Sequence, residues 1–497
     1  MLGTDATTRN PASQTGYLSA RRGIVLGLSA LLLAFGPAAQ AQDSAAASDA
    51  QRYIGVEEIR AGMDAYCLTD YGQAGIEKFA LKVVDVIRDI DPGHDAILVM
   101  GTDDRFKHTG PVGGCSGSPV YIDGRLAGAL AFGWTFPKDP LYGVTPIKEM
   151  LEVGRTNPNL AGRRAGREPA FTFDFSQPID LAAVNEQIMS RRLIGSGPTN
   201  GATALPCPLL ISGLPTDVSQ RLASDFEAMG FMAVPGLAGS ASSGDDAPSE
   251  LKPGGTLTVP LVTGDIRLNV MGTVTEVRDD RVYAFGHSFL GYGSLNLPMA
   301  GGKVYTVVST LMRSFKLGTS TEIVGALTVD EYAAVSGKIG AEPRMVPLSI
   351  RVERYNDPMA RSYDCQVAYN DLLTAQLVRS AIAAAALQLG TLPPDHTIEY
   401  DVAIDLADGQ SVRFGNVSTS TGLLEPAAEI GGALALLMNN PYDGPEIKAL
   451  DFTIRMRPDN ITAHLWSVDV VDPQIEPGQD LDIDVVVESF LSEKRRY

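Results

Sequence analysis

The chain has 497 residues, 44% of them hydrophobic, and a formal net charge of −19. An acidic surface disfavours nucleic acids and anionic membranes as partners, because both carry negative charge. The four cysteines and five histidines show no spacing typical of a metal site, so we expect neither a metal nor an organic cofactor. The length predicts several domains, and the apolar content is ample for packed cores.

The first 41 residues have the features of a secretory signal peptide rather than of folded structure. Arg21 and Arg22 precede an apolar run at 23–35, and Ala-Gln-Ala at 39–41 offers a small-residue cleavage site. The apolar run is too short to span a bilayer comfortably. We therefore expect an exported protein, most simply periplasmic, with no membrane span once the signal peptide is removed.

Residues 42–165 are predicted to form the first all-β unit. Segments 81–87 and 96–100 are rich in valine, isoleucine and leucine, which is typical of strands. An Asp-Gly pair at 123–124 lies between apolar segments and predicts a two-residue hairpin turn. A short helical run at 146–153 is expected to close the unit.

Residues 166–253 are predicted to be an α/β connector. Helices are expected at 180–192 and at 215–229, the second beginning with proline and followed by a glycine. Residues 236–253 are rich in glycine, serine, alanine and proline, a composition that predicts a flexible linker.

A second all-β unit is predicted at 254–353, where apolar residues alternate and Asp-Asp at 279–280 marks a turn. Residues 354–497 are predicted to be an α+β region with apolar helices at 371–389 and 424–438 and a sandwich-like tail. The last strands are expected at 450–456, 461–472 and 479–489.

The most informative stretch is Gly-Cys-Ser-Gly-Ser-Pro at 114–119, which runs directly into the predicted hairpin. This G-x-S-G-x-P pattern resembles the nucleophilic serine of chymotrypsin-like peptidases, in which glycines let the backbone turn tightly at the serine. The resemblance makes Ser116 the candidate nucleophile and gives the N–H groups of Gly114 and Ser116 as its oxyanion hole. The alternative is a tight turn that carries a solvated serine.

His287 is the candidate base. It stands between Gly286 and Ser288 at the end of a predicted strand, so a turn presents it rather than a helix face. The alternative is a core or loop histidine with a satisfied hydrogen bond. A third interpretation uses His108 as the base, although it lies only eight residues before Ser116.

Together these segments resemble the SpoIVB family of serine peptidases. That family carries a G-M-S-G-S-P serine motif and a G-T-x-T segment followed by an A-L-G-H histidine motif. Here the serine motif is matched at 114–119, Gly-Thr-Val-Thr at 272–275 and Ala-Phe-Gly-His at 284–287. The resemblance covers roughly residues 55–155 and 255–350, and the serine block precedes the histidine block, the reverse of the family order.

The resemblance also implies an acidic partner and an unusual cysteine. The family's acidic residue lies shortly before the serine, which carries the role of orienting the histidine to Asp103, with Asp104 beside it. Cys115 replaces the family's methionine, and relatives usually have glycine near the position of Cys67. Two such cysteines in one exported unit imply a Cys67–Cys115 disulfide, with two buried free thiols as the alternative.

The sequence thus predicts a mainly β protein with two chymotrypsin-like β-barrel units, an α/β insertion and an α+β C-terminal region. The function implied is that of an exported serine endopeptidase with the triad Ser116, His287 and Asp103, acting on protein or peptide substrates through an acyl-enzyme. The alternative is a catalytically inactive, peptidase-like envelope protein that binds peptides or protein partners.

Overall fold

We analysed a computed structural model of the chain. Outside the described residues lie the expected signal peptide, the expected helix at 180–192 apart from Ala183, and most of the expected helix at 215–229 and linker at 236–253. The structure describes residues 49–72, 74–134, 137–155, 176, 183, 202–212, 220, 223, 226–227, 229–236, 250–291, 293–388, 390, 392–420, 423–440, 444–471, 474, 476 and 478–497.

The protein is mainly β, as the sequence predicts, and its first unit is a closed antiparallel barrel of six strands. The strands pair in the order β5-β1-β2-β3-β7-β6, and pairing of β5 with β6 closes the ring. Buried and exposed side chains alternate along β1, as expected of a strand with one face on a core. We call this unit the serine barrel. Its strands are β1 (Asp64–Asp70), β2 (Ile76–Asp91), β3 (His94–Gly101), β5 (Pro119–Ile122), β6 (Arg125–Trp134) and β7 (Leu141–Pro146).

Local signals predicted several parts of the serine barrel correctly. The expected strands at 81–87 and 96–100 lie within β2 and β3. The Asp-Gly pair at 123–124 has φ values of 51° and 76° and joins β5 to β6. Such left-handed pairs match the twist of a two-residue hairpin. Helix α3 (Ile147–Glu152) follows β7 where the short helix was expected.

The second unit, the histidine barrel, also closes into a ring of six strands. Its pairings run β11-β12-β13-β16-β15-β14 and return to β11. The turn expected at 279–280 joins β12 to β13, with Asp279 at a φ of 56°. The strands are β11 (Thr256–Gly264), β12 (Leu268–Arg278), β13 (Arg281–Ala284), β14 (Gly293–Val308), β15 (Ser314–Glu331) and β16 (Ala334–Ile339).

Two short stretches tie the barrels together. Strand β4 (Val112–Gly113) lies just before the serine motif and pairs in parallel with the start of β15. After the connector, β8 (Ala202–Ala204) pairs with β6 of the serine barrel, and β9 (Cys207–Ile211) pairs with β12 of the histidine barrel. The chain therefore passes from one barrel to the other at residues 205–207. Strand β10 (Phe231–Pro235) lies beside β9.

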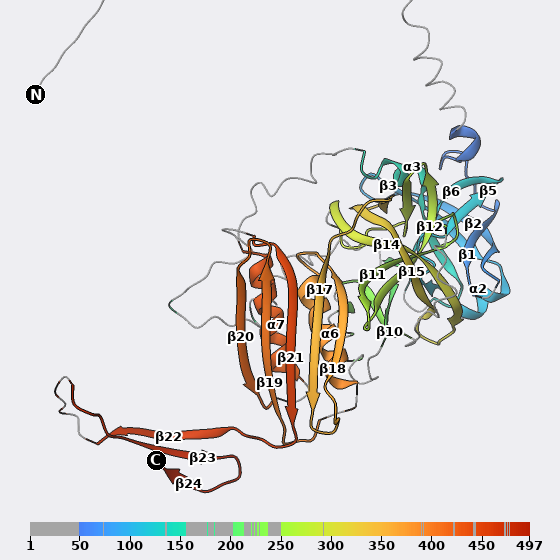
Figure 1. The fold of residues 1–497 in the computed structure, drawn as a ribbon. Coiled ribbons are helices and arrows are strands. Elements are labelled where there is room, and N and C mark those ends of the chain that lie inside the picture. Colours follow the sequence, from blue (N-terminus) through green and yellow to red (C-terminus); the bar gives the residue numbers. More distant parts are fainter. Residues whose placement is uncertain are drawn as a thin grey trace, which may run out of the picture. The chain divides into compact units, whose positions relative to one another are not determined.

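The C-terminal region is an α+β layer in which two helices pack on one face of a sheet (Figure 1). Helices α6 (Thr374–Leu387) and α7 (Leu424–Met438) contact each other, and α6 also contacts β17, β18 and β11. In the turn that leads into α6, the Asn370 side chain accepts hydrogen bonds from the N–H groups of Leu372 and Leu373 at 3.0 and 3.1 Å. The strands are β17 (Met345–Arg354), β18 (Arg361–Ala368), β19 (Thr397–Leu406), β20 (Ser411–Ser418) and β21 (Ile447–Arg457).

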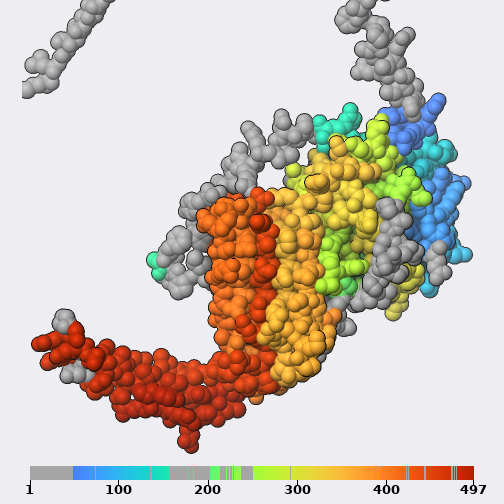
Figure 2. All heavy atoms as spheres, in the orientation of Figure 1, coloured from blue at the N-terminus to red at the C-terminus, as the bar shows by residue number. Residues whose placement is uncertain are grey.

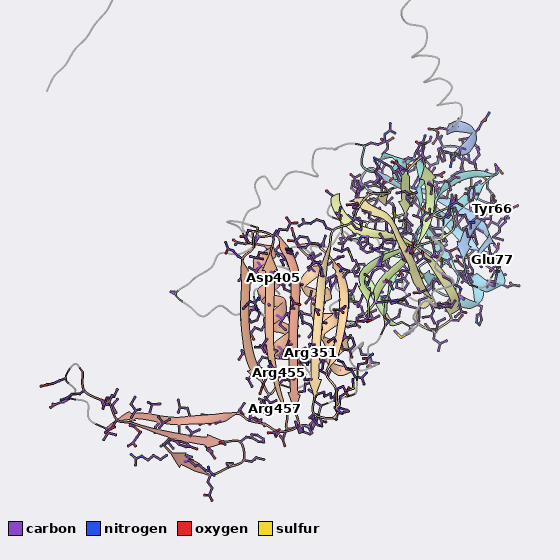
Figure 3. The ribbon with its side chains drawn as sticks, in the orientation of Figure 1. Tyr66, Glu77, Arg351, Asp405, Arg455 and Arg457 are labelled. Carbon is purple, nitrogen blue, oxygen red and sulfur yellow. The ribbon has the colours of Figure 1, made fainter. Side chains whose placement is uncertain are left out.

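The opposite face of this sheet is polar. Arg351, Asp405, Arg455 and Arg457 lie on it (Figure 3), and the space-filling view shows its strands as one continuous surface (Figure 2). Arg455 pairs with Asp401 across the strands at 2.6 Å. Pairs on a solvated face contribute little stability individually, so the apolar side chains beneath α6 and α7 stabilise this layer.

The tail differs from the expected sandwich. Residues 450–456 belong to β21 in the larger sheet, and the tail is one three-stranded sheet of β22 (Ala463–Val470), β23 (Ile483–Ser489) and β24 (Lys494–Arg496). A sandwich needs a second sheet to cover the first, and β22 is almost entirely exposed. No helix among the described residues is long and apolar enough to cross a membrane.

Candidate active site

The serine motif forms a tight turn between β4 and β5. Gly114 and Gly117, on either side of Ser116, have φ values of 91° and 90°. A Cβ atom at Gly117 would lie 2.1 Å from the carbonyl oxygen of Thr273, so only glycine fits this close approach. The side chain of Ser116 is fully buried, which excludes a solvated serine on a surface turn.

The G-T-x-T segment of the histidine barrel holds this turn in place. The Thr273 hydroxyl donates to the Gly114 carbonyl at 2.8 Å, and the Thr273 N–H donates to the Ser116 carbonyl at 2.9 Å. The Thr275 hydroxyl donates to the Gly117 carbonyl at 2.7 Å. Two threonines of one barrel therefore fix the serine turn of the other, which gives a physical reason for threonine at both positions.

His287 lies on an equally constrained turn after β13. Phe285 and Gly286, just before it, have φ values of 66° and 70°. Left-handed backbone is costly for a phenylalanine, and such strain gathers at functional sites. The Thr145 hydroxyl of the serine barrel donates to the Gly286 carbonyl at 2.6 Å. Each barrel thus holds the other barrel's turn.

Asp330 is a buried carboxylate that the sequence analysis missed, and it fixes the chain just after His287. Its oxygens accept hydrogen bonds from the N–H groups of Phe289, Leu290 and Gly291 at 2.7, 2.6 and 2.8 Å. Asp330 is fully buried near the end of β15, a strand of the same barrel as His287. A search for a carboxylate in the histidine block, rather than before the serine, could have found it.

Ser116 and His287 both lie close to the same atom, the sulfur of Cys207. The Ser116 Oγ lies 3.7 Å from the Cys207 Sγ, and this sulfur lies 4.0 Å from the His287 Nε2. Among the described residues, no direct hydrogen bond joins the serine to the histidine. No motif of the sequence points to Cys207, because its place depends on the path of the connector between the barrels.

Burial sets the protonation states of His287 and Cys207, the two residues near Ser116. It lowers the pKa of His287 below the usual 6.5, against the opposing effect of hydrogen bonds to the backbones of Ser288 and Leu205. It raises the pKa of Cys207 to about 12. At neutral pH the imidazole is therefore a neutral base and Cys207 a protonated thiol.

Asp103 does not orient His287, and the resemblance was misleading here. Its carboxylate caps helix α2 (Asp104–Thr109) and accepts from the backbone N–H and the side chain of Arg105, with distances of 3.0 to 3.2 Å. The His287 Nδ1 lies instead 2.7 Å from the Ser288 carbonyl oxygen. An aspartate before a short helix is a typical N-cap, a local role that suffices to explain it. The neighbouring Asp104 is exposed and pairs with Lys107 at 3.0 Å.

His108 is also excluded as the base. It lies in the last turn of α2 with an exposed side chain, whereas Ser116 is buried. Since its hydrogen-bond partner would have to be inside the protein, His108 has no geometry for deprotonating Ser116.

Of the two expected oxyanion donors, one is already in use. The Gly114 N–H donates to the carbonyl oxygen of Pro206 at 3.2 Å. The Ser116 N–H has no acceptor among the described residues. The Gly114 N–H is therefore placed to donate to a backbone carbonyl, and Pro206 of this chain supplies that carbonyl.

The expected Cys67–Cys115 disulfide is absent, because both residues are buried free thiols. Burial raises the pKa of each thiol. The Cys115 Sγ accepts a hydrogen bond from the Thr69 hydroxyl at 3.8 Å. Lys316, which the sequence analysis did not single out, is fully buried behind the serine turn and donates to Thr69 and Thr273 at 2.8 and 3.1 Å.

Comparison with known protein families gives no matching family, and comparison with curated proteins gives no matching relative. The arguments on function therefore rest on the site itself and on the motifs of the sequence. Among the described residues, no group of histidine, cysteine, aspartate and glutamate side chains could hold a metal ion.

Proposed function

We propose that this protein is an exported serine endopeptidase of SpoIVB type in which Ser116 is the nucleophile and His287 the base. The observation that carries the proposal is the convergence of Ser116 and His287, from two different barrels, on one sulfur atom at 3.7 and 4.0 Å. Two closed six-stranded barrels with one catalytic residue each match the chymotrypsin-like arrangement that the motifs imply.

In the proposed reaction, the Ser116 hydroxyl attacks the carbonyl carbon of a peptide once Cys207 has moved aside. The neutral imidazole of His287 takes the hydroxyl proton at Nε2 and returns it to the leaving amine. The Ser288 carbonyl accepts a hydrogen bond from the Nδ1–H at 2.7 Å. This bond favours the tautomer in which Nε2 carries no proton. Water then hydrolyses the acyl-enzyme.

The N–H groups of Gly114 and Ser116 would stabilise the oxyanion. The contact of 3.2 Å between Gly114 N and the Pro206 oxygen supports this role, because it places a peptide carbonyl at that donor. Asp330 has a positioning role, since it anchors the backbone that follows His287 rather than the reacting atoms.

The test is casein hydrolysis by the purified protein after removal of residues 1–41. Ser116→Ala should abolish cleavage, and Ser349→Ala is the matched control, because Ser349 lies on the exposed face of the C-terminal sheet. Cleavage by S116A at the wild-type rate would overturn the assignment. Export would be supported by a mature N-terminus at Gln42 in the secreting cell.

A second candidate is a peptide-binding envelope protein without catalysis. The pairing of β8 with β6 favours it, because this pairing shows that the edge of β6 accepts an extended strand. Peptide binding with no cleavage by any variant would favour this candidate over the peptidase.

A further inference from the structure

The segment that joins the two barrels lies along the serine barrel like an added peptide strand. Strand β8 is antiparallel to β6, with Ala202, Thr203 and Ala204 opposite Trp134, Gly133 and Phe132. The Leu205 N–H continues this ladder by donating to the Ala131 carbonyl at 2.8 Å. Because β6 follows the hairpin that begins at Ser116, a strand added in this direction runs into the site.

The residues that follow β8 contact the groups that would carry out the reaction. The Pro206 carbonyl accepts a hydrogen bond from the Gly114 N–H at 3.2 Å. The Cys207 sulfur lies between Ser116 and His287. The base, an oxyanion donor and the nucleophile are thus all contacted by two consecutive residues, Pro206 and Cys207.

This occupancy does not lead to reaction. Attack needs a single carbonyl whose carbon faces Ser116 and whose oxygen faces the oxyanion donors. Here the carbonyl at Gly114 belongs to Pro206, while the atom facing the serine is the thiol sulfur of Cys207, which is no electrophile. Prolines at 206 and 208 restrict the backbone on both sides of Cys207 and so favour this arrangement over a reactive one.

The side chains of the segment indicate what kind of peptide the groove accepts. Leu205 is 2% exposed and belongs to the same apolar cluster as Leu130 and Phe106 of the serine barrel. Ala204 lines a small cavity of about 50 Å³ together with His287 and Phe132. The groove therefore has a closed apolar site for a leucine-sized residue, and room beside the histidine for a side chain larger than alanine.

The segment's pairing with β6 is short. Its ladder with β6 has three paired positions, and a second cavity of about 280 Å³ lies beside Thr203 and Pro206. A strand this short makes few hydrogen bonds, so the buried Leu205 side chain contributes most of the stability of the docked segment.

We propose that residues 202–207 are an internal substrate mimic that blocks the active site until it leaves the edge of β6. The peptides admitted in its place are extended and carry a leucine-sized apolar residue at the position of Leu205. The proposal rests on the proposed peptidase function, since it assumes that this site is catalytic.

The experiment measures how fast a fluorophosphonate probe labels Ser116 in wild type and in Leu205→Asp, which places a charge in the apolar site. Labelling of L205D should be roughly tenfold to a hundredfold faster, because full burial of one leucine shifts an equilibrium by about that factor. Thr203→Ser, with an exposed side chain and the same backbone hydrogen bonds, is the matched control and should label like wild type. Thr203→Pro removes an N–H from the ladder without touching the core and should also accelerate labelling.

A second measurement is the binding of a fluorescent, capped hexapeptide copy of residues 202–207. It should bind L205D and T203P, slow their labelling, and leave wild type unaffected. Equal labelling rates in wild type and both variants would overturn the mimic while leaving the peptidase proposal standing. Peptide binding by the variants without any labelling would support the mimic and overturn the peptidase. Neither binding nor labelling in any variant would overturn both.

Discussion

The serine turn and the histidine turn share a left-handed backbone conformation but differ in the residues that adopt it. Both turns use left-handed backbone, with φ values of 91° and 90° at Gly114 and Gly117, and of 66° and 70° at Phe285 and Gly286. Glycine adopts this conformation freely, whereas phenylalanine adopts it at a cost. The serine turn therefore has glycine at both left-handed positions, whereas the histidine turn bears the cost of one left-handed phenylalanine.

The supporting contacts differ accordingly. Hydroxyl and amide donors of Thr273 and Thr275 secure the carbonyls of the serine turn, and the Asp330 carboxylate secures the N–H groups that follow His287. A carboxylate that accepts three backbone N–H groups contributes a stronger, charge-assisted set of bonds. Both turns therefore depend on side chains from other strands, hydroxyl groups in one case and a carboxylate in the other.

The largest effect is expected from replacing the base. His287→Ala should lower the rate of casein hydrolysis by ~10⁴-fold or more, as losses in Ser-His sites usually do. The matched control is His108→Ala, which removes an exposed histidine and should leave the rate unchanged. If H108A were the inactive variant, the assignment of the base would be wrong.

The serine turn can be broken at one glycine. Gly117→Ala should lower the free energy of unfolding by about 3–4 kcal/mol, because the alanine adds a left-handed penalty and an overpacked contact with Thr273. Gly124→Ala is its control: the φ there is 76°, but no heavy atom lies within 4 Å of the new Cβ. That variant should lose only about 1–2 kcal/mol. If urea titrations gave equal losses of unfolding free energy in the two variants, the close approach to Thr273 would not contribute to the effect.

A smaller effect is expected at the carboxylates. Asp330→Asn removes the charge that holds the histidine turn and should slow hydrolysis by roughly 10- to 100-fold, with a free energy of unfolding lower by about 1–3 kcal/mol. Asp103→Asn is the control, because Asp103 serves only as the cap and ion-pair partner of α2. Its hydrolysis rate should stay within about twofold of wild type, since a cap contributes stability rather than chemistry. A D103N variant slower than D330N would restore the triad implied by the family resemblance.

The smallest effect concerns pH. Since burial lowers the pKa of His287, the folded protein binds this proton only below pH 6.5, whereas the unfolded chain binds it near 6.5. The free energy of unfolding should therefore fall as the pH drops below 6.5. NMR titration of the imidazole nitrogens in wild type should give a midpoint below 6.5. A midpoint above 6.5 would mean that the site stabilises the imidazolium instead.

The sequence could predict what local chemistry decides. Segments rich in valine, isoleucine and leucine predicted the strands at 81–87 and 96–100, and the Asp-Gly pair predicted the hairpin after Ser116, because both signals act within a few residues. Serine and histidine motifs likewise identified the two turns. The predicted role of Asp103 is wrong, because a position shortly before the serine does not determine contact with a histidine in another barrel.

Other features could not be read from the sequence because they depend on packing between distant segments. Cys207 reaches Ser116 only through the pairing of β8 with β6 and of β9 with β12. Lys316 is buried behind the serine turn because β15 crosses between the barrels and pairs with β4. Cys67 belongs to the apolar cluster of the serine barrel, whereas Cys115 is buried beside the Thr69 hydroxyl, so their presence in one unit did not imply a bond.

The most direct test of the account is to map the site of covalent labelling. Protein incubated with a fluorophosphonate probe would be digested, and the modified peptide identified by mass spectrometry in wild type, L205D and H287A. We predict a single adduct on Ser116, more of it in L205D and none in H287A. An adduct on another serine, or undiminished labelling of Ser116 in H287A, would contradict the pairing of Ser116 with His287.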